Sequence, residues 1–480
     1  MRRLLIATAV ALLAAPLVAA PAWLRMQTPH FTVSGDVDAS RLRNLATRLE
    51  AFRDAIGQLL PGARPPALMP TFVVVFDNER EFAPFKPIVR GKPAPLVGYV
   101  TGDRLTPCIA LSLDGSGDAD LTVFHEYAHL LLRRPGPLPP LWFEEGAAEF
   151  YSTIAVARNA ASVRIGRPVE RHLIALRLAI AQPYDSSQES ARKSSAYIPL
   201  TDLLEATVES PQLAMVYAES WALVHYLLIG NPARTPQLRA FLDAVQEGQP
   251  PRQAFAATLR PVSDLDRELR LYVRAGVYAV KEVPLGERGG TSSVSASKMS
   301  GAEVVATQGR LLMHLERDAE AAERLAAAIA ADPEVLDAQL AFGLLRMRQE
   351  RPADAVGPLR RAAEIDRGNV LIAYDYGLSA LNARDASRSS GVPMPDETLA
   401  HAHDVLQAAL PESPSGEVLG VLGALEARLG RLDAAERTLR RARAASPGRL
   451  PIMIELANVY TRAGKVEEAL KMRVAIDAIR

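Results

Sequence analysis

Two histidines four residues apart, with a glutamate beside the first, are the residues of this sequence best suited to catalysis. His125, Glu126 and His129 form an H-E-x-x-H motif inside an apolar stretch. Positions four apart lie on one face of a helix, so both imidazoles can reach a single cation. Glu126 is then placed to accept a proton from an attacking water. The pattern predicts a zinc-binding helix; the alternative is a buried helix with two structural histidines.

A third zinc ligand is expected in a second helical segment, residues 142–151, which follows a turn rich in proline and glycine. Catalytic zinc takes three protein ligands and leaves a fourth position open. Glu145, with 15 residues between it and His129, is the predicted third ligand. Glu149 lies one helical turn later on the same face. A carboxylate in that position can orient a ligand imidazole through its N–H group.

The sequence HEYAH, the proline-rich turn and WFEEGAAE together resemble the gluzincin metallopeptidases, which include thermolysin and aminopeptidase N. The Trp-x-x-Glu-Gly-x-Ala part is most similar to the aminopeptidase N side and to bacterial gluzincin-like proteins of unassigned substrate. In these enzymes two histidines and a downstream glutamate hold zinc. The resemblance implies an α+β zincin-like domain over residues 23–285, with a small sheet and a mainly helical lower part. The gap between His129 and Glu145 is shorter than is usual in the family. Glu149, or less favourably Glu144, therefore remains open as the third ligand.

Two further expectations follow from this resemblance. The segment that begins Tyr217-x-x-Ser-x-x-Leu-Val is similar to the family region whose tyrosine stabilises the tetrahedral oxyanion. Tyr217 is therefore a predicted oxyanion donor, with a packed helix tyrosine as the alternative. Zincins align the substrate backbone along a sheet edge by strand addition. Ile109–Leu113 is the predicted edge strand, with an ordinary internal strand as the alternative.

The surrounding segments are expected to contain strands and helices first, and then mainly helices. Apolar residues recur at helical spacing over Ala39–Leu59, and Thr71–Phe76 is a β-branched run typical of a strand. Residues 151–283 are predicted to be mainly helical. The polar stretch Tyr184–Ser195 within them is predicted to be a mobile loop or a lid over the site. Shorter strands are expected in Trp23–Gly35 and Gly98–Val100.

The N-terminus has the three parts of an export signal. Residues 1–3 are basic at two positions, residues 4–17 are apolar, and Ala20-Pro21-Ala22 offers a cleavage site. Residues 1–22 are therefore predicted to be a signal peptide of a periplasmic or secreted protein, without a stable membrane span after cleavage. A retained signal anchor is the alternative. Cys108 is the only cysteine, so no intramolecular disulfide can form.

Length and charge limit the classes of protein to consider. A chain of 480 residues exceeds what one core usually organises, so two or three domains are expected. The 55 basic and 55 acidic residues give a net charge of zero, which argues against nucleic acid as a partner. Residues 286–300 are rich in glycine and serine and are predicted to be a flexible linker between two domains.

Residues 301–480 contain an internal repeat. Alanines recur at intervals of 34, 80 and 34 residues, and small residues precede them by twelve. This period resembles the tetratricopeptide repeat, a pair of antiparallel helices, and about four units are expected to stack into a curved all-α solenoid. Extra residues within 383–397 are expected to form a loop. Such arrays usually bind peptides or proteins in their concave groove. The repeated alanines are Ala321, Ala355, Ala435 and Ala469.

These features together predict an exported zinc metallopeptidase of gluzincin type, with Glu126 as the general base and a repeat array that recruits a peptide substrate or a protein partner. One alternative is a catalytically silent, peptidase-like scaffold whose repeats bind proteins. The intact Glu126 argues against it, because a scaffold needs no general base between two ligand histidines. A second alternative is a zinc hydrolase that acts on an amide of the cell wall.

Overall fold

The structure is a computed structural model, and the residues that it describes lie in ten ranges. The predicted signal peptide, except Ala22, and the loop predicted at Tyr184–Ser195 lie outside these residues. The described ranges are 22–59, 70–102, 107–114, 118–132, 138–157, 161–181, 197–259, 261–285, 295–390 and 394–479.

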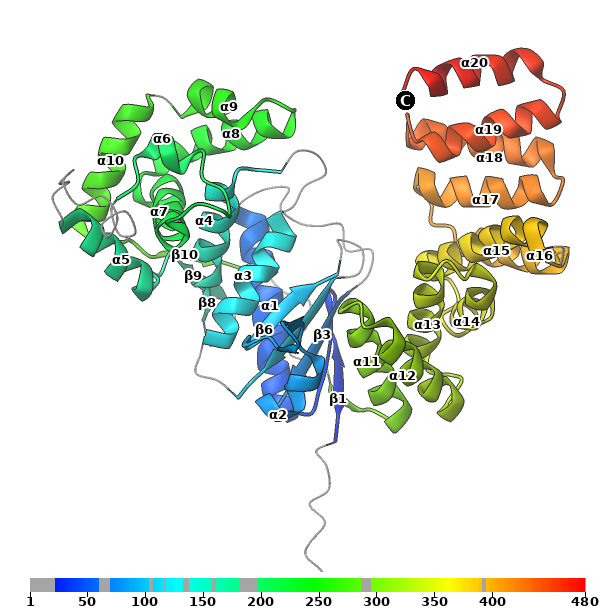
Figure 1. Ribbon diagram of the computed structural model, residues 1–480, viewed down its shortest axis with the longest axis horizontal. Helices are drawn as coiled ribbons and strands as arrows, with labels where there is room; N and C mark the ends of the chain where they lie inside the picture. Colours follow the sequence, from blue (N-terminus) through cyan, green and yellow to red (C-terminus); the bar gives the residue numbers. More distant parts are fainter. Residues whose placement is uncertain are drawn as a thin grey trace, which may run out of the picture.

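A six-stranded sheet forms the centre of the N-terminal part of the molecule (Figure 1). Its strand order is β11-β1-β2-β3-β7-β6. The pairs β2–β3 and β3–β7 are parallel, and the other pairs are antiparallel. The strands are Leu24–Gln27 (β1), Phe31–Gly35 (β2), Thr71–Phe76 (β3), Gly98–Thr101 (β6), Cys108–Ser112 (β7) and Ser297–Lys298 (β11).

Two strands of the sheet differ from their predictions. The segment Trp23–Gly35, expected to hold one short strand, is a hairpin of β1 and β2, because the backbone reverses where Thr28 N donates to Phe31 O at 2.8 Å. The predicted edge Ile109–Leu113 is internal, because β7 pairs with β3 on one side and with β6 on the other. Among the described strands, β6 is therefore the outer strand at this end of the sheet.

Helices surround this sheet, and a mainly helical region follows, as predicted. The helix α1 has the predicted bounds, Ala39–Leu59. The helix that carries the H-E-x-x-H motif is α3, Asp118–Leu132, and the helix that carries Glu145 is α4, Leu141–Ser152. Short elements between β3 and β6 are α2 (Glu79–Phe82), η1 (Ala83–Phe85), β4 (Ile88–Val89) and β5 (Lys92–Pro93). The helical region comprises α5 (Glu170–Ala181), α6 (Leu200–Leu203), α7 (Leu213–His225), η2 (Tyr226–Gly230), η3 (Pro232–Arg234), α8 (Thr235–Gln246), α9 (Pro251–Thr258) and α10 (Val262–Ala275), with a small sheet of β8 (Ala155–Val156), β9 (Ser162–Ile165) and β10 (Lys281–Pro284).

The continuous helix of α7 and η2, Leu213–Gly230, is long and apolar enough to cross a membrane by length and composition. It is also 72% buried inside the protein. Its Trp221 is fully buried, and Gly146 of α4 lies directly against its backbone. These contacts are typical of the core helix of a folded domain.

The C-terminal part is an array of helix pairs (Figure 1). The described residues form five pairs, where about four units were predicted. The extra residues, expected as a loop, instead extend α15 to Ser390, and α16 begins at Asp396. The helices are α11 (Gly301–His314), α12 (Asp318–Ala331), α13 (Leu336–Arg348), α14 (Pro352–Ile365), α15 (Val370–Ser390), α16 (Asp396–Ala408), α17 (Gly416–Arg428), α18 (Leu432–Ala445), α19 (Leu450–Arg462) and α20 (Val466–Asp477).

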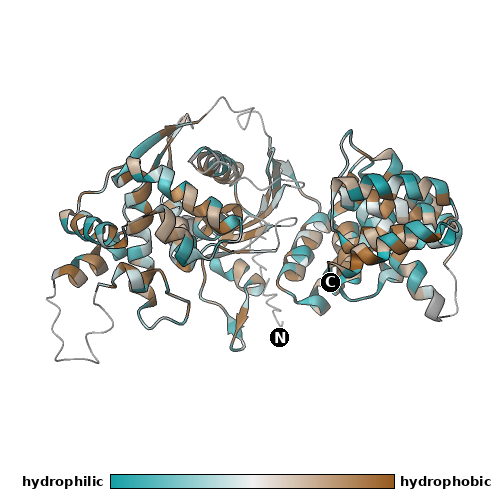
Figure 2. Ribbon diagram, turned by 90° about the horizontal axis from the view of Figure 1, so that it is seen from above, coloured by the Kyte–Doolittle hydropathy of each residue, from teal (hydrophilic) through white to brown (hydrophobic). Residues whose placement is uncertain are grey.

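Hydrophobic and hydrophilic residues alternate along these helices (Figure 2), as expected where each helix packs one side against its neighbours. The repeated small residues have a steric cause. A Cβ atom on Gly309, Gly343 or Gly423 would lie within 2.8 Å of a leucine side chain of the second helix of its pair. Glycine at this position lets the two helices of a pair approach closely.

The segment just before the helical array is ordered and pairs with the sheet. Residues 286–294 of the predicted linker lie outside the described residues, but Ser297–Lys298 form β11, which pairs with β1, and Ser300 caps α11. Two ion pairs also connect the sheet with the array. Arg25 of β1 contacts Glu303 of α11 at 3.1 Å and Asp337 of α13 at 2.8 Å. The prediction of a flexible linker through residue 300 is therefore wrong at its end, because these residues complete the sheet.

The sheet lies between two cores. Successive side chains of a strand point to opposite faces. Val73 and Val75 of β3 belong to the core that includes α1, α3 and α4, whereas Phe72, Val74 and Phe76 belong to a second core. That second core is completed by the array, through Leu311, Leu312, Met313, Ala321, Leu325, Ala341 and Leu345. The first repeats are thus part of the N-terminal fold, and the helices that carry His125, His129 and Glu145 lie on the other face of the sheet.

Candidate metal centre

The helix α3 presents the H-E-x-x-H motif because its other face is apolar. Phe124 stacks on Phe52 of α1 with ring centroids 4.6 Å apart, and Tyr127 is buried against the same ring. This packing turns His125 and His129 to the opposite side, where their side chains are 16% and 20% exposed. Both predicted imidazoles therefore stand on one accessible face of a helix that is anchored in the core.

The helix α4 brings Glu145 to the same place through a close contact with α7. A Cβ atom at Gly146 would lie 2.4 Å from the backbone oxygen of Ser220. Only a residue without a side chain permits this approach. The glycine that follows Glu145 therefore sets how closely α4 packs against α7, and with it the position of the Glu145 carboxylate.

We expect Gly146→Ala to lower the free energy of unfolding by about 1–3 kcal/mol, because the added methyl group must push α4 and α7 apart. Urea unfolding followed by circular dichroism measures this. Gly357→Ala is the matched control, because Gly357 lies in α14 with open space around it. There the substitution should be neutral or slightly stabilising. Equal stability of the two variants would contradict this account of Gly146.

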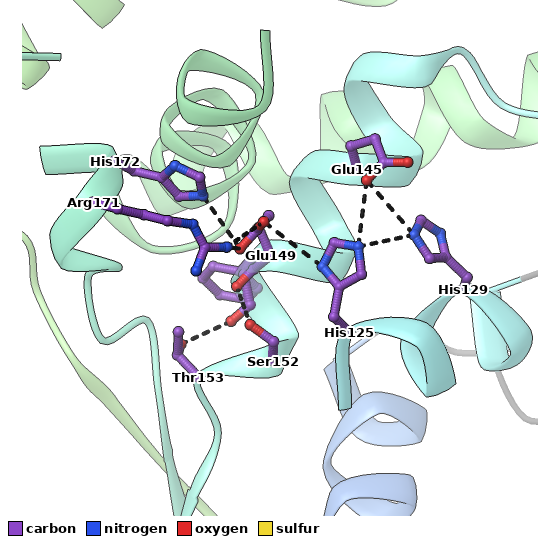
Figure 3. A network of polar contacts seen from close by, with 9 residues as sticks. His125, His129, Glu145, Glu149, Ser152, Thr153, Arg171 and His172 are labelled. Atoms are coloured by element: carbon purple, nitrogen blue, oxygen red, sulfur yellow. Dashed lines mark hydrogen bonds and ion pairs between the residues drawn. The ribbon is translucent and has the colours of Figure 1, made fainter. Parts of the chain in front are cut away.

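Three potential ligand atoms converge between α3 and α4 (Figure 3). The Nε2 atoms of His125 and His129 are 3.3 Å apart, and Glu145 Oε2 lies 3.4 Å from the first and 3.7 Å from the second. Tetrahedral zinc with ligand bonds of about 2.0–2.2 Å places its ligand atoms roughly 3.3–3.6 Å apart. The donor set and its spacing therefore fit zinc.

The electrostatics of the three groups are coupled. Burial alone would raise the pKa of Glu145, but hydrogen bonds and charge from His125 and His129 outweigh it and lower the pKa to about 2. Burial lowers the pKa of His125, but Glu145, Glu149 and Glu126 outweigh that effect and the pKa is raised. A cluster of carboxylates thus favours positive charge at this position, as a cation site requires.

The other carboxylate of α4, Glu149, has a different place. Its Oε1 lies 3.8 Å from Nδ1 of His125, on the side of the ring away from His129 and Glu145 (Figure 3). Among the described residues, one group of three or more His, Cys, Asp and Glu side chains lies close enough to share a metal ion. It comprises His125, His129 and Glu145, and includes neither Glu149 nor Glu144. The structure therefore places Glu145 beside the two Nε2 atoms and Glu149 on the Nδ1 side of His125.

Tyr217 of α7 reaches the same site. Burial, the charges of Glu145 and Glu126, and a hydrogen bond to Glu145 raise the pKa of its phenol. The phenol therefore stays protonated at neutral pH and can donate a hydrogen bond. In contrast, His225 of the same helix is a core residue, with Nε2 2.9 Å from Gly166 O and Nδ1 2.7 Å from the Tyr272 hydroxyl.

Two residues that contact Glu149 were not predicted from the sequence. In the first turn of α5, Arg171 contacts both oxygens of the Glu149 carboxylate and His172 lies beside Oε2. No motif connects them with α4, since they lie 22 and 23 residues beyond Glu149. The sequence offered one signal for them. Histidine is rare in this chain, with 8 in 480 residues, and His172 directly follows an arginine at the start of a helix.

Comparison with known families identifies the C-terminal array. Residues 307–370 and 426–477 each match a model of the tetratricopeptide repeat. The predicted repeats are therefore confirmed, and the chain carries a tetratricopeptide-type helical solenoid next to its N-terminal sheet. This kind of array supports a role in binding proteins. Both matches lie within residues 301–480.

Solved structures that resemble part of the chain include those of three proteins. MamA is 17% identical, with 38% of this chain and 96% of that chain covered and a TM-score of 0.27. PilW, a type IV pilus biogenesis factor, is 21% identical, with 38% and 78% covered and a TM-score of 0.29. YrrB, a repeat protein with an unusual peptide-binding site, is 17% identical, with 37% and 84% covered and a TM-score of 0.29. No curated protein matches the chain.

Proposed function

We propose that this chain is an exported zinc metallopeptidase of gluzincin type whose repeat array holds a protein substrate or partner. The observation that carries the proposal is the convergence of His125 Nε2, His129 Nε2 and Glu145 Oε2 at the spacing of a tetrahedral zinc site. The α+β arrangement of a sheet followed by a mainly helical region supports a zincin-like domain over residues 23–285.

His125, His129 and Glu145 would hold the metal, and Glu149 would fix the orientation of His125. Bound zinc supplies a Lewis acid that polarises the scissile carbonyl and makes water more acidic. Glu126 accepts a proton from the attacking water and passes it to the nitrogen of the leaving amine. Tyr217 donates a hydrogen bond to the carbonyl oxygen as negative charge develops on it.

The outer strand β6 gives this site a means of aligning an extended peptide. It packs directly on α3, since a Cβ atom at Gly98 would lie 2.8 Å from the Val123 side chain. A substrate that adds as a further strand to β6 would lie beside the metal-binding helix. This assigns to β6 the role that the sequence suggested for Ile109–Leu113.

Zinc content measured on purified residues 23–480 tests the proposal. We expect about one zinc per chain in the wild type, and loss of zinc and of activity in His129→Ala and Glu145→Ala. Glu149→Ala should keep the metal with an affinity weaker by about 10–100-fold. Loss of zinc in Glu149→Ala but not in Glu145→Ala would reassign the third ligand. No zinc in the wild type would contradict the proposal.

Tyr217→Phe removes one hydroxyl group and retains the ring. We expect kcat to fall by about 10²–10³-fold with zinc content unchanged, because one donor to the oxyanion is lost. Steady-state hydrolysis of a peptide substrate measures this. Tyr226→Phe is the control, because its hydroxyl donates to Glu268 at 2.8 Å in another part of the helical region. Equal kcat in Tyr217→Phe and the wild type would make Tyr217 a packing residue.

A catalytically silent scaffold is the second candidate, and the repeat-family matches favour it, since they support protein binding by the array. Such a scaffold would bind its partner without turnover. The zinc site supports the enzyme, because a scaffold has no need of Glu126. A wild-type protein that holds zinc but hydrolyses neither peptides nor cell-wall amides would establish the scaffold. Hydrolysis of cell-wall amides alone would place the enzyme in a different substrate class.

A further inference from the structure

A buried ion cluster stands behind the metal site, on the side of Glu149 (Figure 3). We infer that Arg171 and His172 are positioning residues of the metal centre, which act through Glu149 on His125. The inference rests on the proposed zinc site and adds two residues to it that no sequence motif indicates.

Glu149 is the centre of this cluster. Its side chain is 5% exposed, so its charge must be compensated within the protein. Arg171 Nη2 donates to both carboxylate oxygens, at 2.7 Å and 2.9 Å. His172 Nε2 lies 3.2 Å from Oε2, within ion-pair distance. The carboxylate is thereby held from one side, and its Oε1 remains directed at His125 Nδ1, 3.8 Å away.

The position of that oxygen, within ion-pair distance but beyond hydrogen-bond distance of Nδ1, favours Nε2 of His125 as the nitrogen that faces the metal. A carboxylate beside Nδ1 favours the proton at Nδ1, which leaves the lone pair of Nε2 for the metal. Nε2 is the atom that faces His129 and Glu145 (Figure 3). If Glu149 could rotate freely, it would hold neither the ring orientation nor the tautomer of His125.

Arg171 and His172 contribute in different ways. The His172 side chain is 6% exposed, and its ring lies 6.3 Å from that of Trp221 in α7. The buried His172 ring therefore has little room to move and limits the movement of the Glu149 carboxylate on that side. The Arg171 side chain is 62% exposed and reaches inward with its guanidinium. Because its Nη2 contacts both oxygens at once, it compensates the charge of the carboxylate and limits its movement.

Zinc affinity of the folded protein, measured by competition with a chromogenic chelator, tests this inference. We expect Arg171→Ala and His172→Phe to weaken zinc binding by about 10–100-fold, the effect typical of residues that orient a metal ligand. Arg171→Lys keeps a positive charge and His172→Gln keeps a polar group beside Glu149, so these two variants should retain most of the affinity. Arg177→Ala is the control, because Arg177 is an exposed arginine of the same helix.

Thermal unfolding of the metal-free proteins separates positioning from folding. Removal of one partner of the buried Glu149 should lower the unfolding temperature, but Arg171 is largely exposed and His172→Phe preserves the ring, so the metal-free variants should still fold and unfold cooperatively. Unchanged zinc affinity in Arg171→Ala and His172→Phe, beside a weakened Glu149→Gln, would overturn the inference and leave the zinc site intact. So would a loss in Arg171→Ala that Arg177→Ala reproduces. Absence of zinc binding in the wild type would instead overturn the proposed function.

Discussion

Glu126→Gln should lower peptide hydrolysis by about 10²–10⁴-fold while zinc content stays at the wild-type value. The amide has nearly the size of the carboxylate but cannot accept the proton of the attacking water. The three proposed metal ligands do not include Glu126, so the metal should remain. Turnover of a quenched fluorescent peptide library, measured beside zinc content on the same samples, gives both numbers.

Glu209→Gln provides the control for this experiment, because Glu209 is an exposed glutamate outside the metal-binding group. It should retain full activity. Substantial hydrolysis by Glu126→Gln would exclude Glu126 as the general base. Loss of zinc in that variant would show that Glu126 helps to hold the metal, and the ligand set would have to be revised.

Removal of the repeat array should prevent the N-terminal part from folding. A chain of residues 22–300 would expose the face of the sheet that carries Phe72, Val74 and Phe76. Each large apolar side chain that loses its cover costs about 1.5–3 kcal/mol. Several such losses equal the whole stability of a typical domain, about 5–15 kcal/mol. Circular dichroism and size-exclusion chromatography should show an unfolded or aggregated fragment.

A shorter deletion separates this effect from a general need for the array. A chain of residues 22–410 lacks α17 to α20 but keeps every array residue that packs against the sheet. It should fold with its zinc site intact. Cooperative unfolding and zinc binding by residues 22–300 would contradict the shared core. That outcome would support the two independent domains predicted from the glycine- and serine-rich segment.

Local patterns in the sequence were sufficient for much of the fold. The helix Ala39–Leu59 and the strand Thr71–Phe76 have the predicted bounds, because helical and strand periodicities are properties of short segments. The repeats were recognisable because each unit must bury the same positions against its neighbour. The H-E-x-x-H spacing likewise fixes two imidazoles on one helix face before any tertiary contact is known.

The errors concern contacts between distant segments. Ile109–Leu113 and Gly98–Val100 both have strand character, and which one is outermost depends on pairing with β3. The pairing of Ser297 with Arg25 joins residues 272 positions apart, and a polar composition gave no sign of it. Arg171 reaches Glu149 through the fold of the helical region rather than through a spacing along one helix.

The most direct test of the central claim is a crystal structure of the zinc-soaked protein with an anomalous difference map at the zinc absorption edge. The account predicts one strong peak about 2.0–2.2 Å from His125 Nε2, His129 Nε2 and Glu145 Oε2. It also predicts that Glu149 lies outside this shell, beside Nδ1 of His125. A map without a peak at this position, or a peak bound by Glu149 in place of Glu145, would contradict it.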